Sequence, residues 1–325
     1  MTILTVLERQ AGAWHRLSWE TLAAAQQIGR GLGARVIAAV AGREVAALAS
    51  QAAAQKLDRV YAVEHELLGT YTADGFTSAL EALIRKLNPE LVLFPHTYQV
   101  RDFAPKLATR FQAVLVSDVV GHRIEDGRLV LVRQLFQGKL NADVRFAAAG
   151  PWFASIQAGA YRAGQVEAGA AEVEAFAPDL DAGTIRTRPQ PPFREAARAV
   201  DLSAAEIIVS VGRGIKEKDN LPLVEQLASA LGAELAASRP ICDNGWLPME
   251  RQIGSSGQTI SPKLYLAVGI SGAIQHLVGI KGSQCVVAIN KDPDAPIFEV
   301  ADYGIVGDLM EVVPALTEAL KAAKQ

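Results

Sequence analysis

The chain has 325 residues, enough for about two domains, and half of those residues are apolar. A mean hydropathy of +0.16 excludes a largely disordered chain. A net charge of −3 gives no electrostatic reason to expect a nucleic-acid partner. Aromatic residues make up only 6% of the chain, whereas Ala, Val, Leu and Gly abound. This composition is typical of α/β sheets that carry helices on both faces.

The amino-terminal segment, MTILTVLERQ, reads as an immediate strand, without the basic and apolar segments of a secretory signal. No uninterrupted apolar run approaches the roughly 18 residues that a membrane-spanning helix needs. The two cysteines, Cys242 and Cys285, do not form a disulfide framework, which is typical of a reducing compartment. We therefore expect a protein of the bacterial cytoplasm that does not insert into a membrane.

The first half of the chain alternates strand and helix signals. Apolar runs predict strands, and helical periodicity predicts helices, in the order 3–7, 19–32, 36–40, 43–55, 59–63, 76–87, 91–94 and 102–111. Repeated β-α units with short connections favour a mostly parallel sheet. Between 117 and 158 the pattern changes to strands alone, expected at 119–124, 129–135, 143–149 and 153–157, with turns at Asp126-Gly127 and Gln137-Gly138. We expect these strands to extend the first sheet in antiparallel fashion.

Residues 178–193 (PDLDAGTIRTRPQPPF) interrupt this pattern, because they contain four prolines and little apolar periodicity. A second α/β unit begins with a strand at 207–211 and ends with a helix at 309–323. The sequence therefore predicts a first domain over 1–177, a Pro-rich linker over 178–205 and a second domain over 206–325. Such a linker is expected to let the second domain reorient.

Glycines and polar residues follow the predicted strands of the second half. The segment 211–214 (VGRG) could open a phosphate-binding turn, because glycine lets backbone N–H groups approach an anion. It is equally an ordinary β-α turn, since Glu217 replaces the last glycine of a G-x-G-x-x-G fingerprint. The segment 269–276 (GISGAIQH) follows a strand at 264–268 and would open a helix suited to a pyrophosphate. Two structural alternatives remain there: Ser271 as a simple N-cap, and His276 as a buried histidine.

Three further polar clusters accompany these glycine segments. They are the turn 252–257 (QIGSSG), the segment 290–294 (NKDPD) after a strand at 285–289, and the segments 302–304 and 307–308 at the next strand end and helix start. Asp308 is expected to be the N-cap of the last helix. Together the clusters would occupy one edge of one sheet, as a dinucleotide site requires.

Other chemistries lack their motifs in this chain. The five histidines are not paired at metal-ligand spacing, and the start of an H-E-x-x-H pattern at His65 ends at Gly69. The sequence contains no P-loop, no G-x-S-x-G elbow and no C-x-x-C pair. We therefore expect no metal site and no catalytic nucleophile.

The second half resembles the FAD-binding domain of the alpha (large) subunit of electron-transfer flavoproteins, and the likeness extends more loosely over the whole chain. The matching segments follow in order at 212–214, 238–240, 262–265, 269–276, 290–298 and 301–308. The resemblance implies two α/β domains, each a mostly parallel sheet flanked by helices. The first would be Rossmann-like, of the adenine-nucleotide-hydrolase kind, and would pair with a beta subunit without holding a redox cofactor. The second would be doubly wound and would bind FAD.

The resemblance also implies a function, that of an electron carrier rather than an enzyme. Members accept electrons from flavin dehydrogenases, notably acyl-CoA dehydrogenases of fatty-acid β-oxidation, and pass them to a membrane-bound quinone oxidoreductase. The beta subunit holds AMP, or a second FAD in relatives that oxidise NADH and bifurcate electrons. This chain is therefore expected to need a beta subunit, and the bifurcating complex is the nearest alternative. An NAD-dependent Rossmann dehydrogenase and a redox-inactive nucleotide sensor are more distant ones.

The resemblance assigns roles to individual residues around the FAD. Arg239 would favour the negative charge that reduction brings to the ring, Ser256 would approach flavin N5, and His276 would hydrogen-bond the pyrimidine O2. Ser255-Ser256 stands where many relatives have Gln-Thr, which keeps the hydroxyl but leaves the contact of the lost Gln in doubt. The ribityl-pyrophosphate would be wrapped by Ser271, Gly272, Ala273, Ile274 and Gln275, with Arg213 and Ser238 nearby. The AMP portion would be held by Asn290, Asp308 and Leu309. The other expected contacts are Ile253, Gly254 and Ser255.

Overall fold

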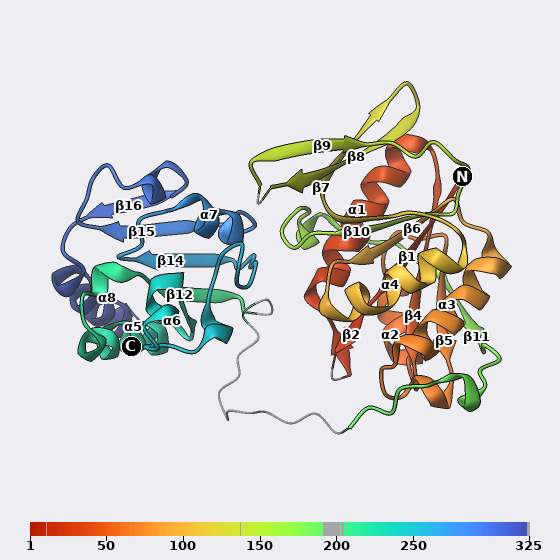
Figure 1. Ribbon diagram of the computed structural model, residues 1–325, viewed down its shortest axis with the longest axis horizontal. Coiled ribbons are helices and arrows are strands. Elements are labelled where there is room, and N and C mark those ends of the chain that lie inside the picture. The colour runs from red at the N-terminus through yellow and green to blue at the C-terminus, as the bar shows by residue number, and fades with distance from the viewer. Residues whose placement is uncertain (11, 137, 191–201, 203–204, 324–325) are drawn as a thin grey trace. The chain divides into compact units, whose positions relative to one another are not determined.

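The computed structural model describes residues 1–10, 12–136, 138–190, 202 and 205–323. The chain divides into two compact units, Met1–Pro192 and Phe193–Gln325, shown in Figure 1. Each unit has its own sheet with helices on both faces, which confirms the expected α/β class. Much of the predicted linker, 191–201 and 203–204, lies outside the described residues, as does the predicted reorientation about it.

Within the described residues, the first unit contains a nine-stranded sheet in the order β11-β5-β4-β1-β6-β10-β7-β8-β9. Its strands are β1 (Thr2–Leu7), β4 (Arg35–Gly42), β5 (Arg59–Glu64), β6 (Leu91–Pro95), β7 (Leu115–Glu125), β8 (Arg128–Leu135), β9 (Leu140–Val144), β10 (Trp152–Ile156) and β11 (Glu172–Phe176). Its helices are α1 (Arg16–Leu32), α2 (Ala46–Ala53), α3 (Ala73–Leu87) and α4 (Tyr98–Arg110). Shorter elements are β2 (Arg9–Gln10), β3 (Ala13–Trp14), η1 (Glu66–Leu68), η2 (Ala163–Gln165) and η3 (Ala182–Thr184).

The helices of the first unit pack on opposite faces of its sheet. Helices α1 and α2 contribute Leu22 and Leu48 to one apolar cluster, and α3 and α4 contribute Leu80 and Phe103 to the other. The central strands are buried along most of their length, because both faces are covered. This explains why they read as continuous apolar runs in the sequence rather than as alternating ones.

Strand β10 is the main departure from the predicted antiparallel extension. Strands β7, β8 and β9 are antiparallel as predicted, and Asp126 and Gly127 turn the chain between the first two with φ of 49° and 71°. Strand β10 instead lies between β6 and β7 and is parallel to both. The antiparallel assignment of 153–157 was therefore wrong. Its four consecutive buried residues, Phe153 to Ile156, suit a central parallel strand covered on both faces.

Three smaller details of this region also differ from the sequence-based prediction. The strand expected at 143–149 ends earlier, as β9 (Leu140–Val144). Residue 137 of the second predicted turn lies outside the described residues. Strand β11 was not predicted, and it pairs parallel with β5 at the edge of the sheet.

Within the described residues, the second unit has a five-stranded, wholly parallel sheet in the order β13-β12-β14-β15-β16. Its strands are β12 (Ile207–Val211), β13 (Glu234–Ala237), β14 (Leu264–Val268), β15 (Val286–Asn290) and β16 (Tyr303–Val306). Its helices are α5 (Leu221–Leu231), α6 (Arg239–Asp243), α7 (Ile274–Ile280) and α8 (Leu309–Ala323), with short turns η4 (Arg213–Ile215), η5 (Lys218–Asn220), η6 (Met249–Arg251) and η7 (Pro296–Glu299). The strand order reverses between β12 and β14, which makes this a doubly wound fold with its switch point there.

Helices α5 and α8 cover one face of the second sheet and α7 packs on the other. Strands β12 and β14 and helix α8 have the bounds that the sequence predicts. Among the described residues, no helix has the length and apolar character needed to cross a membrane.

Candidate functional site

The carboxyl ends of the second sheet's strands form one edge, because all five strands are parallel. Figure 1 shows the arrowheads of β14, β15 and β16 pointing the same way. The predicted polar clusters that follow β12, β14 and β15, and the pair 307–308 after β16, meet at this edge. Asp302 does not, because it precedes β16 and its Oδ2 accepts a hydrogen bond from the Val286 N–H at the opposite edge (2.7 Å). Placing 302–304 at a strand end was therefore wrong.

The turns after β12 and β14 touch each other through glycine backbone. The Gly214 N–H donates to the Gly269 carbonyl (3.0 Å), and the Gly212 N–H donates to the Val268 carbonyl (2.8 Å). A Cβ at Gly212 would lie 2.3 Å from the Gly269 oxygen, so this position requires glycine. The Arg213 side chain projects from this turn into solvent. The glycines bring two loops into contact at the switch point, where doubly wound folds bind their ligands.

The segment after β14 presents an open turn before helix α7. Gly272 has a φ of +85°, and a Cβ there would lie 2.2 Å from the backbone nitrogen of Ile297. Helix α7 begins after Ala273, which is its N-cap and makes no side-chain capping bond. The alternative of Ser271 as the N-cap is therefore wrong. Four side chains of this turn are exposed: Ser271, Ala273, Ile274 and Gln275.

The turn 252–257 joins the end of β13 to the start of α7. The Ile253 N–H donates to the Ala237 carbonyl (3.0 Å), and the Ser255 N–H donates to the Gln275 carbonyl (2.8 Å). A Cβ at Gly279 would lie 2.5 Å from the nitrogen of Gly254, so α7 and this turn approach each other through glycine backbone. As a result the Ser255-Ser256 pair lies beside the open turn that precedes α7.

Arg239 begins helix α6 directly after β13. Its Nε donates to the Asp243 Oδ2 one turn later (3.2 Å), while 68% of its side chain stays exposed. The preceding Ser238 is buried, and its backbone N–H donates to the Val211 carbonyl. This bond ties the start of α6 to the carboxyl end of β12. The guanidinium keeps its remaining N–H groups available at the same edge of the sheet.

His276 lies in the core beneath this edge. It is 6% exposed, and its Nε2 lies 2.7 Å from the hydroxyl of Tyr265, which is fully buried on β14. Its Nδ1 is buried and has no hydrogen-bond partner of good geometry among the described residues. Burial lowers the pKa of His276 to about 4, and the Ile253 backbone opposes this in part. The structure thus shows the buried histidine of the structural alternative, and the O2 contact stays a prediction.

Asn290 and Asp308 both hold loops of the edge together. The Asn290 Nδ2 donates to the Ile270 carbonyl (2.9 Å), and its Oδ1 accepts from the Asp292 N–H (3.0 Å). The Asp308 Oδ1 accepts from the Met310 N–H (2.9 Å), which confirms Asp308 as the N-cap of α8. This bond is the main cause that lowers the Asp308 pKa. The adjoining Leu309 is 5% exposed and packs into the core.

One cation at this edge, Lys216, was missed by the sequence-based prediction. The Lys216 Nζ lies 3.6 Å from the Asp308 Oδ2, and Lys291 also lowers the pKa of that carboxyl. Lys216 has a φ of 69°, which a non-glycine residue adopts at a cost. The predicted phosphate-binding turn ended at Gly214, and a single lysine beyond it matches no motif. Its pairing with residue 308 exists only in the folded sheet.

These features suit a flavin adenine dinucleotide. The glycine-lined edge and the cations Arg213 and Lys216 match the anionic pyrophosphate, and the Arg239 charge suits a ring that gains negative charge. The exposed Ile274 (60%) offers apolar surface on an otherwise polar edge, as a flat ring system requires. The Ser255-Ser256 pair adds hydroxyls beside it. The residues present therefore fit the cofactor that the sequence predicts.

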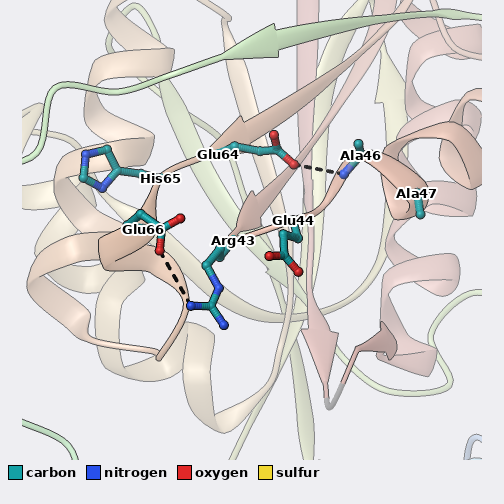
Figure 2. Close-up of a pocket in the computed structure, with 7 residues that line it drawn as sticks. All are labelled: Arg43, Glu44, Ala46, Ala47, Glu64, His65 and Glu66. Carbon is teal, nitrogen blue, oxygen red and sulfur yellow. Dashed lines mark hydrogen bonds and ion pairs between the residues drawn. The ribbon is translucent and has the colours of Figure 1, made fainter.

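A cavity also lies in the first unit. It has a volume of about 600 Å³ and opens at the ends of β4 and β5, as Figure 2 shows. The Glu64 Oε1 accepts the N–H groups of Val45 (2.7 Å) and Ala46 (3.1 Å), and Arg43 pairs with Glu66 at 3.6 Å (Figure 2). A carboxylate of the chain thus occupies the start of α2, where an anionic ligand would need free N–H groups. This cavity lacks the features of a dinucleotide site.

Across the described ranges of the chain, no group of three or more His, Cys, Asp or Glu side chains could hold a metal ion. The histidine of the incomplete zinc motif, His65, instead accepts the Leu67 N–H through Nδ1 (3.1 Å) at the start of η1.

The doubly wound sheet and its glycine-lined edge define a dinucleotide-binding α/β protein. A family model described as the electron transfer flavoprotein domain matches residues 3–181, and one described as the electron transfer flavoprotein FAD-binding domain matches residues 201–281. The chain belongs to the electron transfer flavoprotein family, as an alpha subunit, and its second unit contains an FAD-binding domain.

Relatives cover almost the whole chain. The electron transfer flavoprotein subunit alpha of Bacillus subtilis (strain 168) is 40% identical over 322 residues, covering 98% of this chain and 97% of the relative. The subunit alpha of Thermoanaerobacterium thermosaccharolyticum is 39% identical over 319 residues, with the same coverage of 98% and 97%. An acryloyl-CoA reductase electron transfer subunit beta of Anaerotignum propionicum is 32% identical over 347 residues, covering 98% and 95%. The resemblance seen in the sequence and its FAD cofactor are thereby confirmed.

Proposed function

We propose that this chain carries the FAD of a heterodimeric electron shuttle. It accepts electrons from flavin dehydrogenases, such as acyl-CoA dehydrogenases of fatty-acid β-oxidation, and delivers them to a membrane quinone oxidoreductase. The first domain (1–177) pairs with a beta subunit that holds AMP, and the linker (178–205) connects it to the FAD-binding domain (206–325). The observation that carries this proposal is the convergence of five loops at the carboxyl edge of a sheet in an FAD-binding family.

FAD, when bound, supplies one-electron and two-electron transfer. The Gly212 and Gly214 N–H groups are engaged with the Val268 and Gly269 carbonyls, so the backbone N–H groups of the segment 271–275 would bind the pyrophosphate, with the Arg213 side chain nearby. Asn290, Asp308 and Leu309 would hold the AMP portion. Ser238 would lie near the ribityl-pyrophosphate, the turn 253–256 would lie against the ring, and the Ser256 hydroxyl would be directed toward N5. Arg239 would place its guanidinium charge beside the ring.

The chemistry of the site supports a carrier rather than an enzyme. His276 is neutral and buried, with a pKa lowered to about 4, so it does not exchange protons with a substrate near neutral pH. A hydrogen bond to the pyrimidine O2 would require the buried Nδ1 to become accessible when FAD binds, because Nε2 is bonded to Tyr265. The carboxylates of Asp243 and Asp308 are engaged with Arg239 and with the start of α8. These side chains bind and tune the cofactor, and the partners of the shuttle supply the substrate chemistry.

A second candidate is the alpha subunit of a bifurcating complex that oxidises NADH. It is favoured by the name of the Anaerotignum propionicum relative, which assigns that protein to an acryloyl-CoA reductase. In this case the beta subunit would hold a second FAD instead of AMP. The number of flavins per heterodimer separates the two candidates.

An anaerobic stopped-flow assay tests the proposal. The chain, purified with its beta subunit, is mixed either with an acyl-CoA dehydrogenase and its acyl-CoA or with NADH alone. The shuttle predicts loss of the oxidised flavin absorbance only in the first mixture, with one FAD and one AMP per heterodimer. Bleaching by NADH together with two flavins per heterodimer would favour the bifurcating candidate. Absence of bleaching in both mixtures contradicts both.

A further inference from the structure

A buried glutamine lies directly behind the exposed Ser256. The Gln252 side chain is 1% exposed, and its Nε2 donates to the Ser256 Oγ at 3.0 Å. The Gln252 backbone is itself fixed, because its N–H donates to Met249 and its carbonyl accepts from Gln258. A Cβ at Gly257 would lie 2.3 Å from that carbonyl oxygen, so the chain turns tightly around the glutamine. The amide therefore has little freedom to move away from the serine.

The direction of this hydrogen bond determines where the serine hydrogen points. A serine hydroxyl has one hydrogen and two lone pairs, and one lone pair is taken by the Gln252 amide. The hydrogen must then point away from the glutamine, and since Ser256 is exposed, it points out over the carboxyl edge. In the opposite amide orientation a buried N–H group would be left without a partner, which proteins tolerate less well than an unpaired carbonyl. In the present orientation the unpaired atom is the Gln252 Oε1, a carbonyl oxygen.

We propose that Gln252 is a positioning residue that makes Ser256 a hydrogen-bond donor toward the flavin. This inference rests on the proposed role of Ser256 at N5. Without the amide, the hydroxyl would rotate among its staggered positions and would be aimed at the ring for only part of the time. When the ring gains one electron without a proton, N5 keeps its lone pair and gains negative charge, and a donor held in place beside it would stabilise that form without reorganisation. Gln252 thus acts on the reduction potential of the flavin without touching it.

A double-mutant cycle tests this, using the full chain with its beta subunit. Redox titration, followed by the visible spectrum, gives the ratio of one-electron-reduced to oxidised flavin at a fixed potential. Ser256→Ala and Gln252→Met should each lower that ratio, the first by about fivefold, as expected for one hydrogen bond, and the second by less. In the Ser256→Ala background, Gln252→Met should have no further effect, because it acts through the hydroxyl. Gln258→Met is the matched control, since the Gln258 amide donates to the Glu250 carbonyl instead.

The outcomes separate this inference from the proposed function. If Ser256→Ala lowers the ratio but Gln252→Met does not, or if the two effects add, the positioning role is overturned and the serine contact survives. If Ser256→Ala has no effect, the serine contact and the positioning role both fail, while a yellow protein still supports FAD binding. Gln252→Asn, which keeps an amide but is one methylene too short, gives the same expected loss should the Met variant fail to hold FAD.

Discussion

The imidazole of His276 and the phenol of Tyr265 form a buried hydrogen bond, with 2.7 Å between Nε2 and the hydroxyl oxygen. Burial raises the pKa of Tyr265, so the phenol keeps its proton. The nearby Ser210 hydroxyl is buried on β12 and opposes that rise. The hydrogen bond connects α7 with β14, the central strand of the second sheet, beneath the cofactor edge. It therefore links the stability of the unit to the residues that bind the flavin.

Removing the tyrosine hydroxyl should destabilise this unit. Tyr265→Phe leaves a buried ring nitrogen unpaired, which costs about 1–3 kcal/mol. Hydrogen exchange at the amides of β14 should therefore accelerate, as measured by mass spectrometry on the full chain with its partner. Tyr303→Phe is the matched control, because Tyr303 is 67% exposed, and it should leave exchange unchanged. Equal protection of β14 in both variants would show that the bond contributes nothing to stability.

The buried imidazole should make the second unit sensitive to acid. Its pKa is lowered from 6.5 to about 4, so between these values the unfolded chain binds a proton that the folded chain does not. The contribution of His276 to the free energy of unfolding is therefore complete above pH 6.5, and about 3 kcal/mol of it is lost as the pH falls to about 4. Urea unfolding monitored by fluorine NMR of labelled Trp246 should show this loss, and His276→Gln should reduce it. If the free energy of unfolding depends on pH in the same way in His276→Gln, His276 is not the cause of the acid sensitivity.

Glu8 in the first unit should produce the opposite pH dependence. Burial raises its pKa from 4.5 to about 7, against the hydrogen bond that the Thr97 hydroxyl donates to it. Between these values the folded chain keeps a proton that the unfolded chain releases, so stability falls as the pH rises, by about 3 kcal/mol in all. Urea unfolding followed by fluorine NMR of the first unit's labelled tryptophans measures this loss of stability. Glu8→Gln should abolish it, whereas Glu66→Gln, at an exposed position, should not. If Glu8→Gln leaves the loss in place, Glu8 is not the titrating group.

The charge of Arg239 should raise the reduction potential of the flavin. The guanidinium is held by Asp243 but remains largely exposed at the cofactor edge. Arg239→Ala should lower the ratio of reduced to oxidised flavin about tenfold at a fixed potential, which corresponds to about 1.4 kcal/mol. Arg239→Lys should retain part of the effect, and FAD should stay bound in both. An unchanged potential in Arg239→Ala would contradict the assigned role.

Much of the second unit could be predicted because its signals are local. The strand at 264–268 and the helix at 309–323 are continuous patterns, and the glycines mark turns with positive φ or close backbone contact. Since parallel strands end at one edge, the polar clusters that follow them could be brought together without knowing the strand order. Asp302 was misplaced because the four residues of β16 are all exposed and lack an apolar run. Their strand character comes from pairing with β15.

The remaining features depend on contacts between distant segments. The sequence predicts a strand near 153–157 but not that β10 would insert between β6 and β7, because pairing is set by the long crossover. His276 lies 11 residues from its partner Tyr265 along the chain, and Lys216 lies 92 residues from its partner Asp308. No local pattern marks such pairs. The packing that makes His276 buried and neutral is likewise a property of the folded unit.

The central claim is that the second unit binds FAD within a heterodimer. The most direct measurement is the flavin content of this chain, co-purified with its beta subunit, from the visible spectrum and from the mass of the cofactor released on denaturation. We expect a yellow complex with one FAD per heterodimer, and we expect the chain to lose FAD or solubility when it is produced alone. A colourless complex that does not take up added FAD would contradict it.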